Sequence, residues 1–413
     1  MIPQRGVMVA LILAAQTVAN IGPLGIPAIA SLIRSDLGLT LTQAGSFLSA
    51  YYIGPILMSL PAGTMADQWG IGRTLILGQL VIGAGLIAAS FSGTYAILIV
   101  FMILAGFGYG MLNPTSTKAV MAWSPPRHRA TLVGLKQVGL PFGGALGAAL
   151  LPVIGLALGW RAAVAIAGSL LLITAVASVF IYRDPPGLEK PARHTAGRTI
   201  RSVLMTRDLW LVASATLVFA GMQTVWMAFL VLYLQSVVGL SLLGAGRYLA
   251  LAQIAGMTGR VAFGLLSDRA FGGRRRAPLV IAGVLSALCS LGIAFTGADS
   301  SVVWLSTLVL VFGFAGIGWN GVQHTWMAEL AGPTAAGTAV GLGLAVSSAG
   351  VTLGPLIFGR CVEAAGSYRG PWIGLALSMS AALALLAFVR ERGFLVAIQA
   401  GGLGGRVARP PSQ

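Results

Sequence analysis

The sequence predicts an all-α membrane protein in which twelve transmembrane helices form two related six-helix halves. Three observations lead to this prediction: 57% of the residues are hydrophobic, only 9% are charged, and short strings recur along the chain. Soluble domains carry about 25% charged residues. A chain of 413 residues with this composition is suited to lipid rather than to water.

A helix needs roughly 20 mostly apolar residues to cross the hydrocarbon core of a bilayer. Twelve stretches of about that length lie between charged or Pro- and Gly-rich breaks. We place them at residues 8–30, 42–64, 75–92, 94–116, 131–155, 161–182, 208–234, 244–267, 278–298, 302–328, 336–361 and 371–390. The 57 glycines indicate close helix packing, since small residues let neighbouring backbones approach.

The longest polar interruption covers residues 183–207 and contains three prolines and six basic residues. It divides the spans into two sets of six. We therefore expect an N-terminal six-helix bundle at 1–182, a cytoplasmic linker at 183–207, a C-terminal six-helix bundle at 208–392 and a flexible cytoplasmic tail at 393–413.

The net charge of +16 could suggest a nucleic-acid partner, but its distribution favours a membrane. With the N-terminus inside, about 19 of the 26 basic residues lie in cytoplasmic segments, as the positive-inside rule requires. We expect a multi-pass protein of the cytoplasmic (inner) membrane with both termini cytoplasmic, a monomer that binds no nucleic acid. The run Arg274, Arg275, Arg276 is interpreted as a solvated face near anionic lipid headgroups.

Internal repeats support the division into two related halves. Gln16-Thr17-Val18 recurs as Gln223-Thr224-Val225, and Val133-Gly134-Leu135 recurs as Val340-Gly341-Leu342, both with an offset of 207. The string Gly106-Phe107 with Asn113 recurs at the same offset as Gly313-Phe314 with Asn320. The strings at 63–73 and 264–274 are related by an offset of 201. Four pairs in the same order indicate a duplication.

The fourth pair of strings carries a family resemblance. The pattern Gly-x-x-x-Asp-x-x-Gly-x-x-Arg, which begins at residue 63, resembles the signature loop of the major facilitator superfamily. This resemblance implies the major facilitator fold of two pseudo-symmetric bundles, and a gating role in which each Asp engages charges and a helix terminus of the opposite half. The implied gate residues are Gly63, Asp67, Gly70 and Arg73, with their copies Gly264, Asp268, Arg269 and Arg274.

Charged residues within spans are costly and therefore mark functional sites by default. Arg260 in the eighth span lies roughly 10 Å from its cytoplasmic end, too deep for easy snorkelling. The string Arg260-Val261-Ala262-Phe263-Gly264 resembles the eighth span of monocarboxylate transporters, which implies that Arg260 binds a substrate carboxylate. Alternatively, Arg260 bonds helix carbonyls or the Asp268 network. Gly256 stands where that family has an Asp, which puts a proton-coupling pair in doubt.

Lys136 is the second cation within a span and lies near the start of the fifth. It either snorkels to the cytoplasmic interface or turns inward, in which case two cations face one central site. All ten carboxylates fall in loops or near helix ends. Exporters of cationic compounds usually need a buried acid, so this distribution favours an anionic cargo, with small carboxylates the obvious class.

Uncharged polar residues within the spans complete the candidate substrate site. Each of them either faces the central site or bonds a neighbouring helix. Gln16 and Asn20 are four residues apart and therefore share one helical face. The set consists of Gln16, Asn20, Asn113, Gln223, Gln253, Asn320 and Gln323. His324 near the inner end of the tenth span could carry a proton or be a hydrogen-bonded structural residue.

These residues predict a secondary active transporter that moves a small organic anion by alternating access. The functional resemblance points to bacterial monocarboxylate and organic anion transporters. Uniport, antiport and symport stay open, with protons as one option for the coupling ion. The alternative is proton-coupled efflux of drug-like or amphiphilic compounds. No nucleotide-binding motif, metal-ligand spacing or catalytic arrangement is present in the sequence, so we expect no cofactor and no enzymatic activity.

Overall fold

The computed structural model describes residues 2–123, 129–184, 201–331 and 336–390. Every regular element within these ranges is a helix. Eleven helical segments of this part of the chain are long and apolar enough to cross a membrane. A further helix, α4 (Phe47–Gln68), carries a shorter apolar segment and at about 33 Å is also long enough to span. The predicted all-α membrane fold is therefore confirmed.

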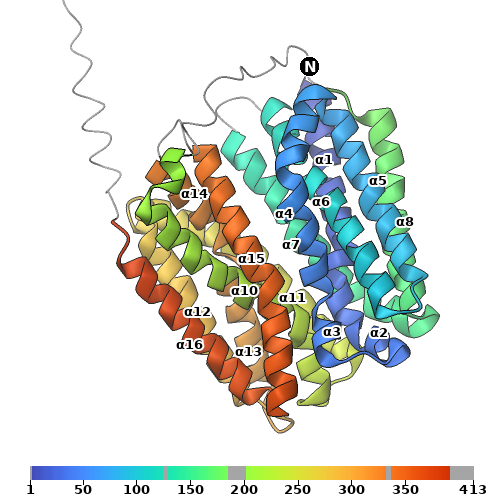
Figure 1. The fold of residues 1–413 in the computed structure, drawn as a ribbon, viewed down its shortest axis with the longest axis vertical. Coiled ribbons are helices and arrows are strands. Elements are labelled where there is room, and N and C mark those ends of the chain that lie inside the picture. Colours follow the sequence, from blue (N-terminus) through green and yellow to red (C-terminus); the bar gives the residue numbers. More distant parts are fainter. Residues whose placement is uncertain (1, 124–128, 185–200, 332–335, 391–413) are drawn as a thin grey trace, which may run out of the picture.

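The N-terminal half contains six long helices that lie side by side (Figure 1). Three short segments, η1 (Ile26–Ile29), α2 (Ala30–Leu37) and α3 (Leu41–Gly45), connect the first long helix to the second. The six helices are α1 (Ile2–Gly25), α4, α5 (Ile71–Ser90), α6 (Tyr95–Trp123), α7 (Arg129–Leu158) and α8 (Trp160–Ile181). The first predicted span does not continue to residue 30 as one helix. Pro27 at the start of η1 lacks an N–H group, and the backbone tightens there.

The C-terminal half repeats this arrangement with two π-helical interruptions. Its elements are α10 (Arg207–Ser236), α11 (Leu242–Leu265), η3 (Leu266–Ala270), α12 (Arg276–Ala294), α13 (Val302–Phe312), η4 (Gly313–Ile317), α14 (Asn320–Ala331), α15 (Ala336–Ala365) and α16 (Arg369–Ala387). The tenth predicted span was expected as one helix. Instead, the π-helical segment η4 separates α13 from α14, and such segments often occur at functional sites.

One close helix contact recurs at equivalent positions of the two halves. Gly106 of α6 packs on the main-chain oxygen of Tyr51 in α4, and Gly313 packs on the main-chain oxygen of Ala252 in α11. A side chain at either glycine would overlap that oxygen. The offsets between these residues are 201 and 207, the same as those of the sequence repeats. The duplication is therefore visible in the packing as well as in the sequence.

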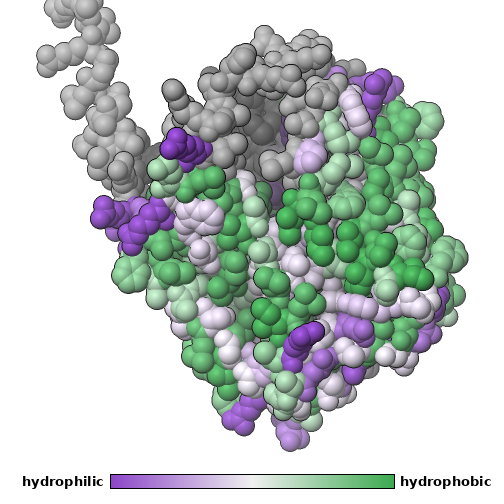
Figure 2. Space-filling view, viewed as in Figure 1, coloured by the Kyte–Doolittle hydropathy of each residue, from purple (hydrophilic) through white to green (hydrophobic). Residues whose placement is uncertain are grey.

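The two halves meet most closely at the end of the bundle opposite the N-terminus. We call this the outer end, and the end that carries the N-terminus the inner end, following the predicted orientation (Figure 1). At the outer end, Gly359 of α15 packs on Thr42 of α3, and the main-chain N–H of Thr42 donates to the Glu363 carboxylate at 2.7 Å. Hydrophobic side chains cover the middle of the face in Figure 2, and hydrophilic ones gather toward the ends.

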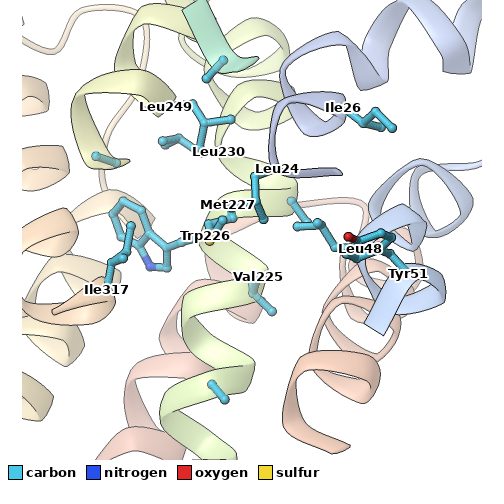
Figure 3. Close-up of a cluster of buried hydrophobic side chains, with 14 of the residues drawn as sticks. Leu24, Ile26, Leu48, Tyr51, Val225, Trp226, Met227, Leu230, Leu249 and Ile317 are labelled. Carbon is cyan, nitrogen blue, oxygen red and sulfur yellow. The ribbon is translucent and has the colours of Figure 1, made fainter. Parts of the chain in front are cut away.

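A buried apolar cluster joins the halves between these ends. Figure 3 shows Leu24 and Leu48 from the N-terminal half with Val225, Met227 and Leu230 from α10. These side chains are at most 5% exposed.

We expect Gly106→Ala to lower the free energy of unfolding by about 1–3 kcal/mol, because the added methyl group must push α4 and α6 apart. Thermal unfolding of the purified protein in detergent measures this change. Gly374→Ala is the matched control, since Gly374 lies within α16 and its added methyl group would meet nothing within 4 Å. Equal midpoints for the two variants would contradict the packing role of Gly106.

Candidate functional site

Arg260 lies near the inner end of α11 and bridges the two halves. Its Nη1 donates to the main-chain oxygen of Gln137 in α7 at 3.1 Å, and its Nε donates to that of Ile317 in η4 at 3.4 Å. Protein surrounds the guanidinium, yet the side chain keeps part of its surface open. No carboxylate of the described residues pairs with it. Both of its partners are therefore neutral carbonyl oxygens, as one of the two interpretations of the sequence anticipated.

Lys136 of α7 is fully enclosed, with an exposed fraction of 1%. Its Nζ donates to Asn113 Oδ1 at 2.6 Å, to the main-chain oxygen of Asn113 at 3.1 Å and to Thr117 Oγ1 at 3.0 Å. These three acceptors match the three hydrogens of an ammonium group. The interpretation that Lys136 snorkels to the interface is therefore wrong. The side chain turns inward toward α6 because Asn113 and Thr117, one turn apart, present their oxygens there.

The two cations are linked through the backbone of α7, because Arg260 binds the carbonyl group of the residue that follows Lys136. Within the described ranges, the ion pairs lie at the ends of the helices and involve Arg161 with Asp36, and Arg275 with Asp268 and Glu329. Buried charges are normally paired with opposite charges. Lys136 and Arg260 have no such pair among the described side chains.

Three tyrosines that are not among the predicted site residues cluster in the N-terminal half, and two of them approach Arg260. The ring centroids of Tyr51 and Tyr109 are 5.4 Å apart, and those of Tyr52 and Tyr109 are 6.2 Å apart. Tyr52 and Tyr109 both lie within electrostatic range of the Arg260 guanidinium. The adjacent pair Tyr51-Tyr52 within an apolar span was the available signal, because a buried tyrosine hydroxyl usually needs a hydrogen-bond partner.

The polar residues of α1 meet those of α6 on the same side of the N-terminal half. Ser116 Oγ lies 3.3 Å from Gln16 Oε1, and Asn20 Nδ2 donates to the main-chain oxygen of Gln16 at 2.6 Å. The hydroxyl group of Tyr109 lies within hydrogen-bond reach of the side-chain amides of Gln16 and Asn20. The structure thus brings Gln16, Asn20 and Tyr109 together, and Tyr109 connects this group to Arg260.

The amides of the C-terminal half bond one another instead of a cation. Gln223 Oε1 accepts from Trp319 Nε1 at 3.1 Å and from Asn320 Nδ2 at 3.3 Å. Gln323 fills the space beside Gly343, which is 207 residues after Lys136. The second half therefore has a glutamine amide in the place where the first half has an ammonium group.

Two further candidates lie near the contact of the halves. Gln253 of α11 packs on Gly144 of α7, and neither atom of its buried amide has a hydrogen-bond partner among the described residues. His324 lies within electrostatic range of Arg260. It makes no hydrogen bond to the described part of the chain. The interpretation of His324 as a structural residue held by a hydrogen bond therefore has no support there.

The predicted gate residues of the N-terminal half lie around the turn between α4 and α5. Gly70 adopts a φ of 100°, which favours glycine, and the N–H of Gly72 donates to Asp184 Oδ1 at 2.9 Å. Arg73 is exposed. Gly63 and Asp67 lie in the last two turns of α4, and the side chain of Asp67 lies outside the described part of the chain.

The copy of this turn contains an ion-pair network within the C-terminal half. Asp268 of η3 accepts from Arg275 Nη1 at 2.5 Å, and Arg275 Nη2 donates to Glu329 Oε1 of α14 at 2.8 Å. Arg275 is 9% exposed, so the run Arg274–Arg276 is not uniformly a solvated face. Arg269 and Arg274 are exposed, and Gly264 lies in α11. The partner of Asp268 belongs to its own half, whereas the resemblance implied the opposite half.

We expect Asn113→Ala to lower the free energy of unfolding by about 1.5–3 kcal/mol, because the buried ammonium of Lys136 loses its shortest hydrogen bond. Asn320→Ala is the matched control 207 residues later, and it removes a bond between neutral groups worth about 0.5–1.5 kcal/mol. Chemical denaturation of both variants in detergent compares the two losses. A larger loss for Asn320→Ala would contradict a charged Lys136.

Known proteins with related sequences and structures support a transporter. The Major Facilitator Superfamily model matches residues 7–355. A probable sulfoacetate transporter of Cupriavidus necator is 29% identical over 378 residues, which cover 86% of this chain and 87% of the relative. The hexuronate transporter of Bacillus subtilis is 25% identical over 377 residues, 87% of this chain and 89% of the relative.

Solved structures share the fold at lower identity. A bacterial homologue of the human lysosomal transporter Spinster, in its inward-facing and occupied conformation, superposes with a TM-score of 0.79 at 19% identity, covering 95% of this chain and 98% of the other. The nucleoside transporter NupG gives a TM-score of 0.79 at 13% identity, covering 93% of this chain and all of the other. This chain is a multi-pass membrane transporter rather than an enzyme, and it belongs to the Major Facilitator Superfamily.

Proposed function

We propose that this protein carries a small organic anion, a carboxylate or a sulfonate, across the membrane. The observation that carries the proposal is Arg260, a guanidinium at the contact of the two halves whose hydrogen bonds go only to main-chain oxygens. A planar guanidinium pairs with both oxygens of a carboxylate and stays charged when poorly solvated. An anionic cargo supplies the counter-charge that the described residues do not.

Lys136 is the second cation of the proposed site. Its ammonium group is held by Asn113 and Thr117 on the side of α7 that faces α6. Its charge makes the electrostatic potential around Arg260 more positive. It does not compete with Arg260 for hydrogen-bond partners. The named cargoes of related transporters, sulfoacetate and hexuronate, are both organic anions, which agrees with this charge distribution.

The alternative of proton-coupled efflux of cationic compounds is less well supported. Such exporters need a carboxylate within the membrane to take the proton and to attract the cation. Every carboxylate among the described side chains lies in a loop or in the terminal turns of a helix: Asp36, Asp184, Asp208, Asp268, Asp299, Glu329 and Glu363. No specific contact among the described residues favours a cationic cargo.

Transport is proposed to proceed by alternating access, in which the two halves rock about the central site. The contact of Glu363 with Thr42 joins the halves at the outer end. Packing of Gly246 in α11 on Pro152 of α7 adds to this closure. These contacts have to break when the site opens outward, and the bond of Arg260 to Gln137 has to exchange as well.

We expect Arg260→Gln to weaken binding of the carboxylate by about 10- to 150-fold, which corresponds to the loss of about 1.5–3 kcal/mol for hydrogen bonds to a charged group. Isothermal titration of the purified protein with mono- and dicarboxylates, and with a cationic dye for comparison, measures the affinities. Arg247→Gln is the matched control, because Arg247 lies exposed on the same helix.

Three results would count against the proposal. Carboxylate affinity that survives Arg260→Gln would overturn the assignment of the anion to this residue. An equal loss in Arg247→Gln would indicate a general effect of positive charge. Binding of the dye without any carboxylate would favour efflux of cationic compounds instead.

We expect Glu363→Ala to open the outer end in a larger fraction of molecules, because removal of its bond to Thr42 shifts the equilibrium by about tenfold. Electron-electron distances between spin labels at residues 35 and 367, placed in a protein without its two cysteines, report the outer separation. The exposed Asp299, changed to Ala, is the control. An unchanged distance distribution in Glu363→Ala would refute this closing role.

A further inference from the structure

The π-helical segment η4 ends on a main-chain oxygen that holds Arg260. Arg260 Nε and Asn320 Nδ2 both donate to the carbonyl group of Ile317, at 3.4 and 3.2 Å. A carbonyl oxygen has two lone pairs, so two donors can share it. Asn320 and Arg260 are therefore linked through one acceptor.

The amide nitrogen of Asn320 has both of its hydrogens committed within the protein. Its two acceptors are the Ile317 oxygen and Gln223 Oε1, the latter at 3.3 Å. The other polar atom of the side chain, Oδ1, can only accept. Asn320 thus has no donor left for a negatively charged oxygen, and a direct bond to an anionic cargo does not suit it.

Two further contacts hold this arrangement in place. Gln223 Oε1 also accepts from Trp319 Nε1 at 3.1 Å, and the same N–H group lies 3.1 Å from the main-chain oxygen of Gly316 in η4. Trp319 is 2% exposed, so protein encloses it. We call Gln223, Trp319 and Asn320 the amide network. It ties α10 to the end of η4.

Close backbone packing places η4 against the helix that carries Arg260. Gly256 and Gly259, which precede Arg260 in α11, pack on Ile317 and Phe314 of η4. A side chain at either glycine would overlap the π-helical segment. Such segments are rare, and they are frequently found at functional sites. Packing of α11 on η4 therefore fixes how close the carbonyl group lies, and the amide network fixes its direction.

The two main-chain bonds of Arg260 leave part of its guanidinium available. The group carries five N–H donors in a planar fork. Nε donates to Ile317 and Nη1 to Gln137, whereas Nη2 makes no hydrogen bond to the described residues. The side chain also keeps part of its surface open. The direction of the Ile317 carbonyl group therefore decides where the free part of the fork points.

We propose that Asn320 is a positioning residue that fixes the Ile317 carbonyl group and thereby orients the Arg260 guanidinium toward an anionic cargo. This inference rests on the proposed binding of an organic anion to Arg260. Bidentate pairing depends on the orientation of the planar fork, so a misdirected guanidinium binds an anion less tightly. Asn113, 207 residues earlier, bonds Lys136 directly. Each asparagine of the repeated pair thus serves one cation of the site.

The test is a double-mutant cycle between Asn320 and Arg260. Isothermal titration of the purified full-length protein in detergent at pH 7 measures binding of succinate, malonate and methanesulfonate, and the anion that binds most tightly is used throughout. We expect Asn320→Ala to weaken its binding by about 3- to 10-fold. In an Arg260→Lys background, which keeps the charge without the planar fork, the same change should weaken binding by less than about twofold.

Two variants control for effects on folding. Gln79→Ala removes a buried amide that bonds Ser178 inside the N-terminal half, and it should leave the affinity unchanged. Trp319→Phe removes the N–H group that holds Gln223 and keeps an aromatic ring beside Phe219. It should weaken binding in the same direction, and it replaces Asn320→Ala in the cycle if that variant does not fold.

The same loss in both backgrounds would show that Asn320 touches the cargo itself, which would overturn the positioning role. An unchanged affinity in Asn320→Ala would overturn it too, while Arg260-dependent binding of the anion would leave the proposed function standing. If none of the three anions binds to the wild-type protein, both this inference and the proposed function are contradicted.

Discussion

Positive charge held inside the bundle, with no carboxylate partner among the described residues, is the constraint on which the centre of this protein depends. Transfer of an ammonium or guanidinium group from water to a protein interior costs several kcal/mol. Lys136 tolerates this cost because three oxygens of α6 accept its three hydrogens. Arg260 relies on two main-chain oxygens, one from each half. All three hydrogens of the Lys136 ammonium group are therefore bonded. The Arg260 guanidinium keeps N–H groups that can bind a ligand.

The asymmetry of the two halves follows from these charges. Equivalent positions keep the same helix contacts, as Gly106 on Tyr51 and Gly313 on Ala252 show. The polar interiors nevertheless differ. Asn113 accepts from an ammonium group, whereas its counterpart Asn320 donates to the amide of Gln223. The duplicated framework is symmetric because its glycines set the helix distances, and the site is asymmetric because a few polar side chains have diverged.

The contacts between the halves combine rigidity with the capacity to separate. Along α7 and α11 they consist of small residues, main-chain oxygens and single hydrogen bonds, as at Gly144 with Gln253 and at Gln137 with Arg260. At the outer end one carboxylate reaches across to α3. Interfaces of this kind are stabilised by close packing rather than by ion pairs, so they can exchange partners at modest cost.

The sequence by itself determined the membrane fold, the twelve spans and the duplication, because apolar length and recurrent strings do not depend on how the helices pack. It also identified Arg260 and Lys136, since a charged residue within an apolar span can be recognised from the order of the residues alone. Only the tertiary structure decided that Lys136 turns inward, that Arg275 is buried in an ion-pair network and that Tyr51 and Tyr109 join Gln16 and Asn20. The physical reason is that a side chain's partners come from other helices, and the rotation of each helix about its axis is set by packing rather than by its own composition.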